Sequence, residues 1–118
     1  MVEHPLEIVR GDTEVFELAF TDEDDVIIDI TGWTVYMTVK VSLFEADDTD
    51  AVISKTVTSH TSPTLGQTEI TFTSTETDNL TPGTLYYYDI QIKTDDDMIK
   101  TIMKGQLNVL YDVTRRTS

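Results

Sequence analysis

The segment from Trp33 to Val41 constrains the fold more than any other, because apolar and polar side chains alternate through all nine residues. One parity carries the apolar set Trp33, Val35, Met37, Val39 and Val41. Successive side chains of a strand point to opposite faces, whereas a helix repeats about every 3.6 residues. The segment is therefore predicted to be a strand with one buried face.

Similar patterns predict strands along most of the chain, separated by turn residues. The predicted strands cover residues 13–20, 26–30, 33–41, 51–59, 67–73, 84–94, 98–103 and 106–113. One helical turn is predicted at 74–80, where acidic residues follow a Ser/Thr N-cap. About eight short strands favour an all-β fold, a single antiparallel β-sandwich. We expect one domain over residues 1–118, with an N-terminal arm (1–6) and a C-terminal arm (114–118).

Three consecutive tyrosines lie in the predicted strand 84–94. Tyr86 and Tyr88 share a parity with the isoleucines that follow, so we expect both rings in the core with their hydroxyls at its edge. Tyr87 has the opposite parity and is a candidate interface residue on the outer face. Tyr36, on the polar face of its own strand, is a second candidate.

The charge balance excludes several classes of partner. The 118 residues include 22 acidic and eight basic ones, a net charge of −14. Such a surface repels phosphate backbones and anionic lipid, so neither a nucleic acid nor a membrane partner is expected. The carboxylate excess suits a halophilic source, such as an archaeal host, because concentrated salt screens the self-repulsion. Cysteine is absent, which excludes disulfides and thiolate metal sites.

The charge is also distributed unevenly along the chain. Residues 1–97 contain 21 acidic and four basic residues, whereas residues 98–118 contain one acidic and four basic residues. A basic end on an acidic body favours head-to-tail docking of copies. Arg115 and Arg116 are therefore candidate interface residues, as is Phe44, an apolar side chain in a polar loop.

The order of these motifs resembles the immunoglobulin-like N-terminal domain of phage upper-baseplate proteins and related small β-sandwich proteins of tailed viruses. The resemblance spans residues 7–113 and rests on Arg10, Gly11, Asp12, Thr13, Asp29, Thr31, Gly32, Leu80, Pro82, Gly83, Tyr86, Tyr88, Gly105 and Val109. It implies an immunoglobulin-like virion structural protein that self-associates and binds other virion proteins. The helical stalk of upper-baseplate proteins has no counterpart in this sequence, so tail, baseplate, capsid-decoration and turret positions all remain open.

No catalytic constellation is recognisable. The two histidines, His4 and His60, have no partner in the sequence that would suggest a triad or a zinc site, so we do not expect an enzyme. Solvated turns are the favoured interpretation of the acidic runs. If two of these turns meet at one end, the candidate ligands for calcium or another hard cation are Asp22, Asp24, Asp95 and Asp97. No other cofactor is expected.

Two alternative functions remain. An acidic DNA-mimic inhibitor of a nucleic-acid-binding protein needs carboxylates along one face, but here they are concentrated at 22–25, 47–50 and 95–97. A cell-surface adhesion module would be secreted, yet MVEHPLEIVR lacks the pattern of a signal peptide. The triplet that begins at Asn79 matches the N-glycosylation pattern, which also arises by chance. The favoured location is the virion, after assembly in the host cytoplasm.

Overall fold

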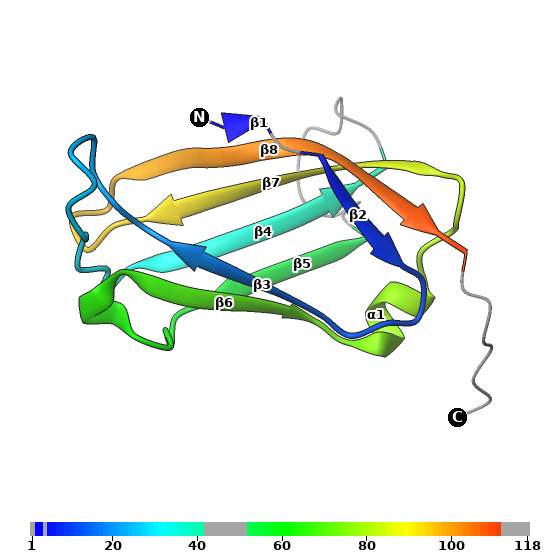
Figure 1. Cartoon of the computed structure of the whole chain (residues 1–118), viewed down its shortest axis with the longest axis horizontal. Coiled ribbons are helices and arrows are strands. Elements are labelled where there is room, and N and C mark those ends of the chain that lie inside the picture. The colour runs from blue at the N-terminus through cyan, green and yellow to red at the C-terminus, as the bar shows by residue number, and fades with distance from the viewer. Residues whose placement is uncertain (1, 4, 42–51, 112–118) are drawn as a thin grey trace.

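The structure, a computed structural model, describes residues 2–3, 5–41 and 52–111, and it consists mainly of β-strands (Figure 1). The strands are β1 (Val2–Glu3), β2 (Leu6–Val9), β3 (Glu14–Ala19), β4 (Thr34–Lys40), β5 (Ile53–Val57), β6 (Gln67–Phe72), β7 (Leu85–Lys93) and β8 (Ile99–Leu110). A 3-10 turn, η2 (Pro63–Leu65), precedes β6, and a short helix, α1 (Ser74–Asp78), follows it. The all-β class predicted from the sequence is confirmed.

The larger sheet has the order β1-β8-β7-β4-β5, and β2 also pairs with β8. Its central strands are antiparallel, with one register shift between Ile90 and Gln91 where β7 meets β8. The alternation in β4 matches the sequence pattern, because Val35, Met37 and Val39 are fully buried while the residues between them are half-buried. The nine-residue pattern therefore identified an internal strand of this sheet.

The pairing of β1 and β2 corrects the prediction of a purely antiparallel arrangement. Both strands run parallel to β8, with Val2 opposite Met103 and Leu6 opposite Leu107. The segment 1–6, predicted as an arm, thus contributes β1 and the first residue of β2. Alternation within a strand shows which side chains share a face, but it carries no information on the direction of the neighbouring strand.

Two further predictions about strands need correction. The predicted strands 98–103 and 106–113 belong to one strand, β8, which continues through Gly105. Gly105 lies opposite Tyr88 in the register of β7 and β8. The predicted strand 26–30 is part of the connection between β3 and β4, where an isolated bridge is the only ladder contact described.

The smaller sheet contains β3 and β6 in antiparallel pairing. Side chains from both sheets form one hydrophobic cluster, in which Ile70 and Phe72 of β6 are fully buried. Phe16 of β3 packs edge-on against Phe72, with ring centroids 5.1 Å apart. The core therefore lies between the sheets, and β3 contributes half-buried side chains to it.

The tyrosine strand is β7, and its parity is as predicted. Tyr86 and Tyr88 are 4% and 3% exposed, whereas Tyr87 is half-buried on the other face. The Tyr86 hydroxyl accepts a hydrogen bond from the backbone N–H of Thr81 at 2.8 Å. Burial raises the pKa of Tyr88. Two of the three tyrosines thus have a structural role in the core.

Candidate functional site: the loop end

Three connections meet at the end of the molecule opposite α1, and we call this region the loop end (Figure 1). It comprises residues 20–33 between β3 and β4, residues 58–66 between β5 and β6, and residues 94–98 between β7 and β8. These connections meet because β3, β5 and β7 all finish at this end (Figure 1).

Backbone hydrogen bonds join the first two connections into one base. Phe20 donates to the Gly66 carbonyl at 2.8 Å, and Ile30 donates to the Pro63 carbonyl at 2.9 Å. Gly66 has a φ of +70°, and a Cβ at this position would lie 2.6 Å from the carbonyl oxygen of Ile28. Glycine is therefore required both by the backbone angle and by the close approach.

His60 strengthens the same base through its side chain. Its Nε2 lies 2.7 Å from the carbonyl oxygen of Trp33, and its Nδ1 lies 2.8 Å from the hydroxyl of Thr68. Because a carbonyl only accepts, Nε2 carries the proton. The Trp33 ring packs edge-on against Phe20, with centroids 5.7 Å apart. His60 thus links Trp33, just before β4, to Thr68 of β6, and both of its ring nitrogens have a hydrogen-bond partner.

The acidic residues of the first connection close local turns. Asp22 accepts hydrogen bonds on Oδ1 from the backbone N–H groups of Asp24 and Val26, at 2.8 and 3.0 Å. Asp29 accepts from the hydroxyl and the backbone N–H of Thr31, and these bonds lower the pKa of Asp29. Both arrangements are Asx turns, in which the carboxylate bonds to backbone no more than four residues away.

The hairpin from β7 to β8 is equally local. Thr94 and Met98 are joined by a backbone hydrogen bond of 2.9 Å, and Asp97 donates to the Thr94 carbonyl at 3.0 Å. Asp97 adopts a left-handed conformation, with a φ of 64°, which aspartate tolerates better than most residues. Its carboxylate forms an exposed ion pair with Lys93 at 3.5 Å.

The four candidate cation ligands all lie at the loop end, but they do not assemble into a site. Asp22 and Asp24 are in the first connection, whereas Asp95 and Asp97 are in the hairpin. Among the described residues, no group of three or more His, Asp or Glu side chains is placed to hold a metal ion. Calcium requires six to eight oxygen ligands, which is more than these side chains bring together.

Exposed apolar side chains lie among these acids. Their exposed fractions are 57% for Val26, 54% for Ile27, 52% for Leu65, 68% for Met98 and 67% for Ile99, the residue that begins β8. Each of the three connections contributes at least one. Apolar residues with a polar rim are typical of protein-docking surfaces. The sequence analysis missed this surface because it assigned 26–30 and 98–103 to strands, although Val-Ile-Ile and Met-Ile follow acidic turns directly.

The predicted interface tyrosines lie elsewhere, on the outer face of the larger sheet. Tyr36 is opposite Gln91, and Tyr87 is opposite Lys40, so the two rings are separated by four residues along the paired strands. At about 3.3 Å per residue, this is roughly 13 Å, and both side chains are half-buried. The other predicted interface residues, Phe44, Arg115 and Arg116, lie outside the described residues.

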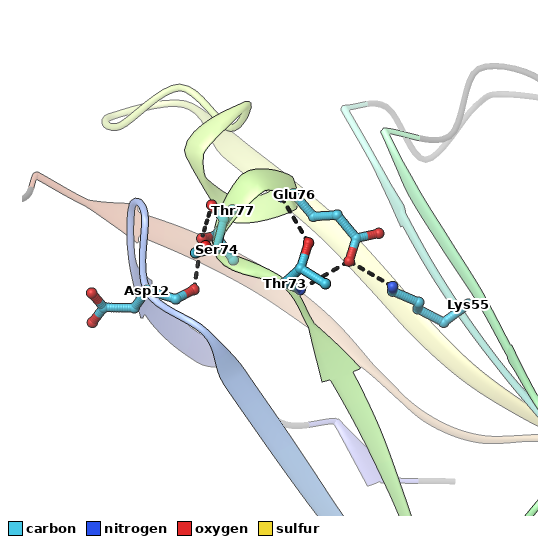
Figure 2. Close-up of polar contacts among 6 residues, drawn as sticks. All are labelled: Asp12, Lys55, Thr73, Ser74, Glu76 and Thr77. Atoms are coloured by element: carbon cyan, nitrogen blue, oxygen red, sulfur yellow. Dashed lines mark hydrogen bonds and ion pairs between the residues drawn. The ribbon is translucent and has the colours of Figure 1, made fainter. Parts of the chain in front are cut away.

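The opposite end of the molecule is built around α1 (Figure 2). The Thr73 hydroxyl accepts from the Glu76 N–H at 3.2 Å, and Glu76 Oε1 accepts from the Thr73 N–H at 2.9 Å, which is a capping box. Lys55 of β5 forms an ion pair with Glu76. Thr77 is fully buried and donates to the carbonyl of Asp12 at 2.7 Å.

Arg10 completes this α1 end, which we define as residues 10–13 and 73–84. Its guanidinium lies 3.2 Å from the Asp78 carboxylate, and Nε donates to the Asp78 carbonyl at 3.2 Å. Side chains from the β2–β3 turn and from β5 thus converge on a five-residue helix. Besides the local capping box, Arg10, Lys55 and Thr77 bond to residues far away in the sequence, and these contacts stabilise the fold.

No protein-family model matches this sequence, and no curated protein matches it either. In the part of the chain that the structure describes, no helix is long and apolar enough to cross a membrane. The function is therefore argued from the surface itself, and the loop end is the surface that best fits a binding role.

Proposed function

We propose that this chain is an immunoglobulin-like β-sandwich that serves as a non-enzymatic structural subunit of a tailed-virus particle. The strand order supports the fold. With β3 taken as strand B, the sequence β8-β7-β4-β5 corresponds to the order G-F-C-C′ of one immunoglobulin sheet. The pair β3–β6 corresponds to strands B and E of the other sheet.

The Tyr86 hydrogen bond gives independent support for this fold. In immunoglobulin-like sandwiches, a tyrosine near the start of strand F bonds through its hydroxyl to backbone a few residues upstream, which is the tyrosine corner. Tyr86 is the second residue of β7, and its hydroxyl bonds to the N–H of Thr81, five residues earlier. Tyr88 stands two residues later, where antibody domains have a disulfide cysteine. This chain has no cysteine, and the Tyr88 ring occupies the core there.

One observation carries the functional proposal, namely the exposed apolar side chains of the loop end. In the immunoglobulin arrangement, the B–C and F–G loops lie together at one end, and variable domains use that end for recognition. Here these loops are residues 20–33 and 94–98, which carry Val26, Ile27 and Met98. Asp22 and Asp29 beside them bond within their own turn segments, so there the surface contributes contact area rather than reactive groups.

The surface also suggests how a subunit docks in an assembly. Burying apolar area stabilises association by roughly 25 cal/mol per Å², a contribution that does not depend on charge. The exposed carboxylates at the rim favour a partner with basic residues around an apolar centre. In strong salt the charge contribution is screened while the apolar contribution persists. We propose that other virion proteins provide such partners.

Analysis of purified virus particles from the source of this sequence tests the proposal. We expect mass spectrometry to detect the chain in the particles, and labelled antibodies to place it at repeating positions by electron microscopy. Particles without the chain would contradict the proposal.

Variants then test the loop end. Met98→Glu is expected to reduce incorporation into particles, whereas Leu85→Glu, the same change on an exposed residue away from the loop end, is expected to be incorporated normally. Equal incorporation of both variants would exclude the loop end as the docking surface. Recovery of a nucleic-acid-binding protein, in a complex that weakens steeply with salt, would instead favour the DNA-mimic function.

A further inference from the structure

The outer edge of β3 is a strand edge with little protection against pairing. The smaller sheet contains only β3 and β6, so within the described ranges no strand pairs with the other side of β3. Its six residues include no proline or lysine, and its register with β6 has no bulge. Its one inward-facing charged residue, Glu14, is the first residue of the strand, whereas Lys55 is at the centre of β5. By contrast, β1 and β2 cover β8, and β5 carries the inward-facing Lys55. Edge strands with few such devices along their length are templates for another strand.

The pairing of β3 with β6 shows which backbone N–H and C=O groups are available at the outer edge of β3. Phe20 donates to Gly66, so the even-numbered residues of β3 form the hydrogen-bonded pairs with β6. The N–H and C=O groups of Val15, Glu17 and Ala19 consequently point away from β6. These groups can form hydrogen bonds with an added strand along the whole length of β3.

Side chains on both faces of β3 would gain contacts from an added strand. On the inner face Phe16 and Leu18 are only half-buried, although they pack against the core. On the outer face Glu17 is directly opposite Glu69, in a pair whose side chains are close because it is not hydrogen-bonded. Like charges in this position are destabilising. A depression of about 420 Å³ is lined by residues that include Glu17, Leu18, Ala19 and Glu69.

We infer that the β3 edge binds the C-terminal segment of a second copy of this chain, residues 112–118, as an added β-strand. The segment DVTRRTS contains Arg115 and Arg116, which complement Glu17 and Glu69. It also contains Val113 and two threonines, which favour extended structure. The added strand neutralises the paired acids and covers the half-buried core residues.

A second copy fits better than the chain's own segment. The segment follows Tyr111, the residue after the end of β8, and stacked sheets lie about 10 Å apart. At about 3.3 Å per residue, crossing to the smaller sheet uses roughly three residues, so the chain's own Arg115 and Arg116 would reach only the start of β3 rather than Glu17. A segment from a second copy does not have this restriction and can place both arginines beside Glu17. This inference concerns self-association and does not depend on the proposed particle function.

Sedimentation of the full chain over a concentration series tests the inference. We expect concentration-dependent association, and Glu17→Arg is expected to raise its dissociation constant by about tenfold or more, because a charge-assisted contact becomes repulsive. Glu7→Arg, the same change at an exposed residue of β2, serves as the control and should leave association unchanged. The triple variant Glu17→Arg, Arg115→Glu, Arg116→Glu should restore association. A monomer at all concentrations, or a triple variant no better than Glu17→Arg, would overturn the inference.

Amide hydrogen exchange gives a second readout that needs no substitution. In the dilute monomer we expect fast exchange at Val15, Glu17 and Ala19, and slow exchange at Phe16 and Leu18. On association, exchange at the three odd-numbered amides should slow by at least about tenfold as they enter a ladder. Protection of these amides that is independent of concentration would place the segment on its own β3. Unchanged exchange on association would place the contact elsewhere, and either result would overturn the inference.

Discussion

The α1 end and the loop end use the same residue types for opposite purposes. At the α1 end, hydroxyls and charged groups bridge distant segments, as Thr77 does with Asp12 and Arg10 does with Asp78, over 65 and 68 residues. At the loop end, the hydrogen bonds of Asp22 and Asp29 stay within four residues. Long-range bonds hold elements in place, whereas local bonds only shape a turn.

This difference explains why the two ends suit different roles. A loop that satisfies its polar groups locally can present apolar side chains to solvent without straining the fold, as Val26 and Met98 do. The connections of the loop end are nevertheless anchored at their base by Gly66 and His60. An anchored base beneath exposed apolar side chains suits binding, because little conformational freedom is lost on contact.

The largest effect is expected at the base of the loop end, for Gly66→Ala. The left-handed backbone costs about 1–2 kcal/mol with a Cβ present, and the contact with the Ile28 carbonyl adds to this, so we expect a loss of about 3 kcal/mol or more in unfolding free energy. Gly32→Ala is the control, because its φ of +84° is similar but the nearest atom is an ordinary 3.4 Å away. Urea denaturation measures both. Equal losses would mean that the packing at Gly66 is unimportant.

The next largest effect is expected for Tyr86→Phe in β7, whose hydroxyl bonds to Thr81 of the α1 end. This change removes the acceptor for the Thr81 N–H and should lower the unfolding free energy by about 2 kcal/mol. Tyr87→Phe removes a hydroxyl from the outer face of the same strand and should change stability by less than about 0.5 kcal/mol. Thermal unfolding of the two variants tests whether the Tyr86 hydroxyl forms a tyrosine corner. If the Tyr86 ring only fills space, the two variants should lose similar amounts of stability.

A smaller effect is expected for Thr77→Val in α1. The substitution keeps the shape of the buried side chain but removes the hydrogen bond to Asp12, so we expect a loss of about 1 kcal/mol. Thr75→Val changes an exposed threonine of the same helix and serves as the control, with little effect. Chemical denaturation would contradict the comparison between the two ends if both substitutions were equally harmless.

The smallest effect is the pH dependence due to Glu76. Burial raises its pKa, but Lys55 and the Thr73 N–H outweigh burial, and the net pKa lies below its ordinary value. A lowered pKa in the folded state contributes stability above the ordinary carboxyl pKa, and this is lost as the pH falls through the lowered value. Glu76→Gln should remove that dependence, with a change below about 1 kcal/mol because the pair is partly exposed. Denaturation midpoints between neutral and acidic pH measure it.

Glu14 supplies a control of opposite sign for this pH series. Burial and the neighbouring Asp12 raise the pKa of Glu14, so its ionised form is disfavoured in the folded state. Its contribution to stability is therefore present at low pH and is lost as the pH rises through the raised value. We expect Glu14→Gln to be slightly more stable than the native chain at neutral pH. A parallel response of both variants would mean that general charge, rather than these two sites, controls the pH dependence.

The sequence predicted much of the strand content but less of the candidate site. Period-2 alternation located β4 and β7, and parity placed Tyr86 and Tyr88 in the core. The helical turn was also anticipated at 74–80, although its N-cap is Thr73. The prediction of a strand at 26–30 was wrong, because an apolar stretch beside a turn has the composition of a strand whether or not a partner strand is present.

The amino-acid sequence alone determined which side chains share a face, because alternation is a property of neighbouring residues in one strand. Only the tertiary structure decided which strands are neighbours, including the parallel addition of β1 and β2 to β8. It also decided that Asp12, Lys55 and α1 would meet at one end while three acidic or apolar connections would meet at the other. The physical reason is that pairing between distant segments depends on how two sheets bury a common core, and no local pattern records that choice.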